Sequence, residues 1–150
     1  MPDEPRNLAI LDEDVQFVIT SGADAVRQGL NRALGVPPLS LLSREDRSTA
    51  EIVLAEVFNN IVEHAYAGRD GSIRVWLSLD DCGLTCRIED EGRPMPGGQA
   101  PAGRPPEPQD LPEGGFGWHL IRSLSTGLSY QRVGAVNRLC FSLPAERSGA

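Results

Sequence analysis

The first half of the chain contains two kinds of apolar pattern, one typical of a strand and the other typical of helices. Residues 14–20 are rich in β-branched and aromatic side chains, which predicts a strand. Residues 23–34 repeat apolar side chains every four positions, which predicts a helix that stops at Gly35. A second, longer helix is predicted over residues 43–66, and Gly68 closes its far end.

The second half of the chain has the strict alternation of a sheet with one buried face. Strands are predicted over 72–79 and 84–89, joined by a tight turn. A helix near 117–124 and strands near 128–132 and 138–143 complete the pattern. This order of elements predicts an α+β two-layer sandwich, with helices on one face of a mixed, mostly antiparallel sheet.

A proline- and glycine-rich segment interrupts this pattern between Gly92 and Gly117. It holds 7 of the 12 prolines and 7 of the 16 glycines in the chain. Proline lacks an N–H group and has a fixed φ, so no long helix or regular strand fits here. Long irregular segments within a domain are functional or disordered. Because glycine motifs flank it on both sides, we interpret residues 93–113 as a lid within a single domain that spans residues 1–150, with a core over 14–143.

Composition narrows the classes of function. The net charge of −7 argues against a nucleic-acid-binding protein that relies on a basic surface. All 14 basic residues are arginine, which excludes a P-loop lysine or a Schiff-base lysine. No apolar run is long enough to span a bilayer, and the acidic N-terminus is unlike a signal peptide, so we expect a cytoplasmic protein without membrane contact. The three cysteines form no CxxC pair and are expected to be reduced.

A polar stripe runs along the second predicted helix beside its apolar face. Glu56, Asn60 and His64 follow one another at intervals of four residues and therefore share one side of the helix. A solvated helix face has the same pattern. However, asparagine is a poor helix former, and the oxygen atoms of Glu56 and Asn60 are ligands that Mg²⁺ accepts.

Two short glycine motifs flank the predicted lid. Asp90 ends a strand two residues before Gly92, where a carboxylate could accept a hydrogen bond from an exocyclic amine; a plain turn has the same residues. Gly115, Phe116 and Gly117 open a helix, and glycines at a helix N-terminus let the backbone approach a phosphate.

Taken together, these motifs resemble those of the GHKL ATPase superfamily, whose Bergerat fold is found in histidine kinases, Hsp90, gyrase B and MutL. The resemblance rests on the helix motif of residues 56–65, the Asp-x-Gly-x-Pro box that begins at Asp90, and the glycine box of residues 115–121. Within the superfamily the chain is most similar to the stand-alone bacterial anti-sigma factor serine/threonine-protein kinases. Two features depart from the pattern: Pro94 and Pro96 stand where a second glycine is usual, and residues 137–141 lack the threonine that often lies beside adenine.

The resemblance implies a role for each matching residue. Asn60 would coordinate Mg²⁺, and Glu56 would act as the general base or position the attacking group. Asp90 would bind the adenine amine of ATP, with Gly92 allowing close approach. The remaining expected nucleotide-binding residues are those that would wrap or lie near the phosphates: His64, Gly115, Phe116 and Gly117. For His64 a structural role is an equal alternative.

The function implied is that of an ATP-dependent serine kinase that sequesters a sigma factor and phosphorylates a STAS-type anti-anti-sigma partner. The resemblance also implies a homodimer. Two alternatives remain open on the same residues: a nucleotide-responsive binding module without kinase activity, and a detached histidine-kinase catalytic domain. All of them predict Mg²⁺-dependent ATP binding.

Overall fold

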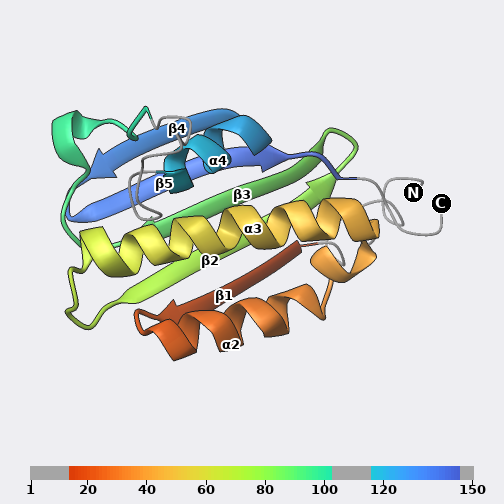
Figure 1. Cartoon of the computed structure of the whole chain (residues 1–150), viewed down its shortest axis with the longest axis horizontal. Coiled ribbons are helices and arrows are strands. Elements are labelled where there is room, and N and C mark those ends of the chain that lie inside the picture. Colours follow the sequence, from red (N-terminus) through yellow and green to blue (C-terminus); the bar gives the residue numbers. More distant parts are fainter. Residues whose placement is uncertain (1–13, 103–115, 146–150) are drawn as a thin grey trace, which may run out of the picture.

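The structure, a computed structural model, describes residues 14–102 and 116–145. Figure 1 shows three helices on one face of a five-stranded sheet. The helices are α2 (Ala23–Leu34), α3 (Arg44–Asn60) and α4 (Phe116–Leu124). The strands are β1 (Asp14–Thr20), β2 (Ser72–Asp80), β3 (Gly83–Asp90), β4 (Thr126–Val133) and β5 (Val136–Leu143). This arrangement confirms the predicted two-layer α+β sandwich.

The strands lie in the order β1-β2-β3-β5-β4, and each neighbouring pair is antiparallel. The sheet of the described residues is therefore antiparallel throughout rather than mixed. Because β5 is inserted between β3 and β4, the end of β3 lies beside the start of β5, where Asp90 pairs with Asn137. The sheet order thus joins two polar residues that are far apart in the sequence.

The core lies between the helices and the covered face of the sheet. Ile73, Val75, Leu77 and Leu79 alternate on β2 and are at most 2% exposed. The opposite face of the sheet is polar: the guanidinium of Arg87 stacks 4.1 Å from the ring centre of Trp76. Because one face of β2 is buried and the other is not, its apolar and polar residues alternate, and this alternation predicted the strand.

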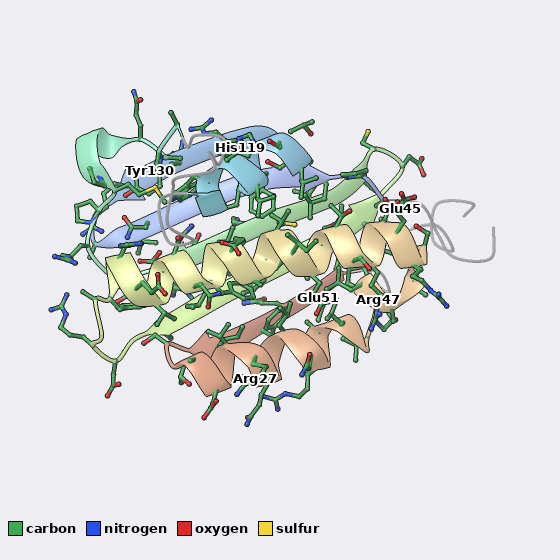
Figure 2. All side chains as sticks on the ribbon, in the orientation of Figure 1. Arg27, Glu45, Arg47, Glu51, His119 and Tyr130 are labelled. Atoms are coloured by element: carbon green, nitrogen blue, oxygen red, sulfur yellow. The ribbon has the colours of Figure 1, made fainter. Side chains whose placement is uncertain are left out.

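The first two helices match the sequence pattern to different degrees. Helix α2 has the predicted bounds, and α3 begins after Ser43, whose hydroxyl accepts a hydrogen bond from the Asp46 N–H at 3.2 Å. Arg47 connects the two helices through its Nε, which donates to the carbonyl of Leu34 at 3.1 Å (Figure 2).

The prediction of one continuous α-helix over 43–66 is wrong beyond Asn60. Residues Ile61–Ala65 form a π-helical turn (η2), in which the N–H of Tyr66 donates to the carbonyl of Ile61 at 2.9 Å. Such turns insert one residue into a helix and are frequent at functional sites. Here the turn changes the direction of the last predicted polar residue, His64, relative to Asn60.

The last two strands are longer than the sequence predicted. β4 begins at Thr126 rather than near 128, and β5 begins at Val136 rather than near 138. In the described part of the chain, no helix combines the length and apolar character that crossing a bilayer requires.

Candidate functional site

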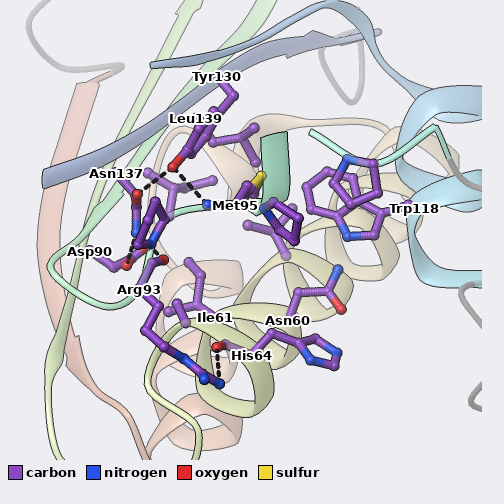
Figure 3. A pocket seen from close by; sticks show the side chains of 16 residues that line it. Asn60, Ile61, His64, Asp90, Arg93, Met95, Trp118, Tyr130, Asn137 and Leu139 are labelled. Atoms are coloured by element: carbon purple, nitrogen blue, oxygen red, sulfur yellow. Dashed lines mark hydrogen bonds between the residues drawn. The ribbon is translucent and has the colours of Figure 1, made fainter. Parts of the chain in front are cut away.

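A cavity of about 550 Å³ opens between the end of α3, the end of β3 and the start of α4 (Figure 3). This volume lies within the range of small-molecule pockets. Its walls are mostly apolar, with a few polar groups directed inward. The lining residues come from α3, the turn Ile61–Ala65, β3, the segment after β3, α4, β4 and β5: Val57, Asn60, Ile61, His64, Ala65, Ile88, Asp90, Arg93, Pro94, Met95, Pro96, Pro101, Trp118, Tyr130, Asn137 and Leu139.

Asp90 is the buried carboxylate of this cavity and is only 5% exposed. Its Oδ1 accepts hydrogen bonds from the Gly92 N–H and from Nδ2 of Asn137, each at 2.8 Å. Among the described residues, no side-chain hydrogen bond reaches Oδ2. Burial raises the pKa of Asp90 above its ordinary value, and the bonds from Asn137 and Gly92 partly oppose that rise. Oδ2 is therefore the acceptor left for a ligand.

Gly92 is fixed by its contact with the π-helical turn. A Cβ at this position would lie 2.5 Å from the carbonyl oxygen of Ala65, which is backbone and cannot easily move. The next residue, Arg93, donates its N–H to the same oxygen at 2.8 Å. Tyr66 adds a second connection, since its hydroxyl accepts from the Glu91 N–H at 2.9 Å. The π-helical turn and the Asp90–Gly92 turn therefore form one rigid wall of the cavity.

Asn60 and Glu56 face the first turn of α4. The Nδ2 atom of Asn60 is buried and has no hydrogen-bond partner among the residues that the structure describes. A Cβ on Gly117 would lie 2.4 Å from Oε1 of Glu56 and 3.7 Å from Nδ2 of Asn60. Only glycine fits against Glu56 without displacing it. The structure thus brings together the predicted helix stripe and the predicted glycine box.

His64 lies at the rim of the cavity rather than inside it. Its side chain is 75% exposed, and its Nε2 lies 3.9 Å from Oε1 of Glu63, which is 68% exposed. Figure 3 shows the imidazole at the edge of the cavity, near Asn60. This position is compatible with contact to a bound ligand and gives no sign of a buried structural role.

The first part of the predicted lid, residues 93–102, is held to the rest of the site by hydrogen bonds. Nη2 of Arg93 donates to the carbonyl of His64 at 3.1 Å. From α4, Arg122 donates to the carbonyls of Pro101 and Ala100 at 2.7 Å and 2.9 Å. One short 3₁₀ turn, Pro96–Gly98, occurs in this part. Residues 103–115, including Gly115, lie outside the described residues, and Phe116 is described only as the first residue of α4.

The sequence interpretation missed the contribution of β4 and β5. Asn137 on β5, at 4% exposure, bonds to Asp90, and Tyr130 on β4 and Leu139 on β5 line the cavity. One signal was present: Asn137 falls in phase with the buried Leu139 and Phe141, so the alternation of β5 places a polar side chain on the covered face. Asn137 is thus the polar side chain that β5 directs toward the cavity.

The sequence of this chain matches the model of one known family. The sequence model of the histidine kinase-like ATPase domain matches residues 20–143. The chain belongs to this family. The matched residues include all three motifs, from the helix motif of residues 56–65 to the glycine box of residues 115–121.

Solved structures share the fold of this ATPase domain, and one of them illustrates the likeness. It is the crystal structure of the RsbU and RsbW domains of Rv1364c from Mycobacterium tuberculosis, with a TM-score of 0.56 and 14% sequence identity. The similar region covers 89% of this chain and 33% of that chain, so this ATPase domain spans about a third of that neighbour's length. Among curated proteins, none matches the sequence.

Domains of this family generally bind ATP with Mg²⁺, and the residues of the cavity fit such a ligand. The open Oδ2 of Asp90 suits an amine donor, and the unpartnered amide of Asn60 leaves a buried polar group for a ligand to satisfy. In the described part of the chain, no group of three or more His, Cys, Asp or Glu side chains could hold a metal ion. The side-chain oxygen of Asn60 could ligate Mg²⁺ together with phosphate oxygens of a nucleotide, as is usual for this ion.

Proposed function

We propose that this ATPase domain binds Mg²⁺-ATP in the cavity and acts as an anti-sigma factor with serine kinase activity toward a STAS-type anti-anti-sigma partner. The observation that supports ATP binding best is Asp90. It is a buried carboxylate in an apolar cavity, with one oxygen occupied by two donors and the other open. An acceptor of this kind favours the exocyclic amine of adenine.

The other residues of the site would contact either the adenine base or the phosphates and Mg²⁺. Ile88 and Leu139 offer apolar walls for the base, and Gly92 keeps the strand end close to Ala65. Asn60 would coordinate Mg²⁺ through its side-chain oxygen. The predicted phosphate-binding groups are the backbone N–H groups at the start of α4, which a helix N-terminus directs toward anions. They belong to Phe116 and Gly117, with His64 at the rim of the cavity; Gly115, also expected from the resemblance, lies outside the described residues.

Glu56 is our candidate for the general base. It lies one helical turn before Asn60, and its Oε1 is close to Gly117 in the first turn of α4. There its carboxylate would accept the proton of a serine hydroxyl while the serine oxygen attacks the γ-phosphorus and ADP leaves. A positioned base contributes about 10²- to 10⁴-fold to such a transfer.

The partners follow from the resemblance to anti-sigma kinases. The fold shared with a structure that contains an RsbW domain supports a regulatory role of this kind. We propose a sigma factor and a STAS-type protein as the partners, a homodimer as the assembly, and the cytoplasm as the compartment. None of these roles needs contact with nucleic acid.

The test separates ATP binding from phosphoryl transfer. Calorimetry with Mg²⁺-ATP measures binding, and transfer of labelled γ-phosphate to the cognate STAS-type protein measures catalysis. We expect Glu56→Gln to bind ATP within about threefold of wild type and to lose about 10²-fold or more in transfer. Glu51→Gln, an exposed glutamate on the same helix, is the matched control (Figure 2).

Three results would redirect the proposal. ATP binding without transfer by the wild type would favour a nucleotide-responsive binding module. Transfer to a histidine instead of a serine would favour a detached histidine-kinase domain. Absence of ATP binding would remove the basis of the whole proposal.

A further inference from the structure

Asn137 connects the buried carboxylate to the start of the lid. Its Nδ2 lies 2.8 Å from Oδ1 of Asp90, 2.9 Å from the carbonyl of Arg93 and 3.3 Å from the carbonyl of Gly92. A side-chain amide nitrogen carries two hydrogens, so the two shorter contacts are its main hydrogen bonds. One amide group therefore holds both Asp90 and the first residue of the lid.

The oxygen of the same amide extends the network to strand β4. Oδ1 of Asn137 accepts from the hydroxyl of Tyr130 and, at 3.0 Å, from Nη1 of Arg132. The Tyr130 hydroxyl in turn accepts from the N–H of Met95 at 3.0 Å (Figure 3). Arg132 also donates to the carbonyl of Gly92 at 2.7 Å. A continuous chain of donors and acceptors thus leads from Asp90 through Asn137 and Tyr130 to Met95.

This network fixes the way in which Asp90 can meet a ligand. Its Oδ1 is occupied, so an incoming group meets Oδ2. An ionised carboxylate is only an acceptor, which suits the 6-amino group of adenine and repels the 6-oxo group of guanine. Burial opposes ionisation of Asp90, and the bond from Asn137 favours it. Without that bond a protonated carboxyl could donate to guanine as well, and selection between the bases would weaken.

We propose that Asn137 is a positioning residue for base selection, and that Tyr130 transmits occupancy of the base site to Met95 at the start of the lid. This inference rests on the proposed binding of ATP and adds the residues that select the base. It also predicts that adenine binding stabilises the backbone at Met95, because all three groups share one hydrogen-bond chain.

Two variants separate the two parts of the inference. Asn137→Leu keeps a side chain of similar size and removes both hydrogen-bonding atoms. Tyr130→Phe keeps the ring that lines the cavity and removes only the hydroxyl between Met95 and Asn137. Gln131→Ala, at the exposed residue next to Tyr130, is the control. Each protein is titrated with Mg²⁺-ATP and Mg²⁺-GTP, and the hydrogen exchange rate of the Met95 amide is measured with and without each nucleotide.

We expect wild type and Gln131→Ala to prefer ATP and to slow Met95 exchange when ATP is bound. Asn137→Leu should reduce the ratio of ATP to GTP affinity by about tenfold or more. Tyr130→Phe should keep that ratio within about threefold, exchange Met95 about fivefold faster, and lose the slowing by ATP.

An unchanged affinity ratio in Asn137→Leu, or an ATP effect on Met95 that persists in Tyr130→Phe, would overturn the inference while leaving ATP binding intact. If Asn137→Leu does not fold, as judged by its thermal unfolding, Asn137→Ala takes its place in the nucleotide titrations, and an unchanged affinity ratio in that variant would equally overturn the inference. Absence of ATP binding by the wild type would instead contradict the proposed function, and this inference with it.

Discussion

The two ends of the β3–β5 strand pair share one register but differ in chemistry. At one end Leu84 pairs with Leu143, and at the other Asp90 pairs with Asn137. All four side chains are buried, with exposures of 0%, 2%, 5% and 4% in that order. The leucine pair gains free energy from burial, whereas the polar pair costs free energy unless each polar atom finds a partner. This contrast is what we expect if the polar end serves the proposed binding of nucleotide rather than stability.

The polar end contains more hydrogen bonds because it has to satisfy buried groups. Gly92, Tyr130 and Arg132 all bond to Asp90 or Asn137. The leucine end needs no such partners. If this contrast is correct, substitutions at the two ends should affect different quantities: unfolding free energy at the leucine end and nucleotide affinity at the polar end.

The largest expected effect on stability is at the leucine end. Leu143→Ala removes a fully buried side chain and should lower the free energy of unfolding by about 2–5 kcal/mol, through lost burial and the cavity left behind. Urea unfolding measures this change. ATP affinity, measured where the variant is folded, should stay within about threefold of wild type. A large loss of affinity in the folded variant would contradict the separation of the two ends.

A smaller effect is expected where the polar end meets the π-helical turn. Gly92→Ala would place a Cβ 2.5 Å from the carbonyl oxygen of Ala65, so the backbone must move. We expect a loss of about 1–3 kcal/mol in unfolding free energy and a weaker affinity for ATP. Gly22→Ala is the control, because a Cβ there meets no atom within 4 Å; it should cost only about 0.5–1 kcal/mol, since alanine is a poorer N-cap for α2 than glycine. Equal behaviour of the two variants would argue against a rigid Gly92 contact.

The smallest expected effect is a pH dependence that belongs to Asp90. Burial raises its pKa above 3.8, so the folded state binds more protons than the unfolded state just above that pH. Stability from this group therefore falls as pH rises through the raised pKa. Asp90→Asn has no carboxylate at this position and should lack this pH dependence of stability. The unfolding free energy of wild type should fall relative to that of Asp90→Asn between about pH 4 and pH 7. A difference that is constant with pH would contradict the raised pKa.

Much of the fold could be predicted because its signals are local. The bounds of β1 and α2 follow from alternation and from apolar spacing that ends at glycines. The π-helical turn could not be predicted, since a shift from α to π bonding leaves apolar spacing nearly unchanged. Its last residue, Ala65, contacts Gly92, which lies 27 residues later in the chain, and no local pattern reports that contact.

The candidate site shows the same division between local and distant information. Asn60, Asp90 and Gly117 were found because each belongs to a short motif, and the structure brings all three to one region. Asn137 and Tyr130 were missed because their place beside Asp90 depends on the strand order β3-β5-β4. No local pattern encodes that order. The in-phase polar residue of β5 was the only available signal.

The most direct test of the central claim is one pair of measurements on Asp90→Asn. The amide keeps the size of the side chain, removes the charge, and presents a donor where adenine also has a donor. We expect Mg²⁺-ATP affinity, measured by calorimetry, to fall by about a hundredfold or more, while the free energy of unfolding at neutral pH stays equal or rises. ATP affinity equal to that of wild type would contradict the account, because the buried carboxylate would then have no role in binding.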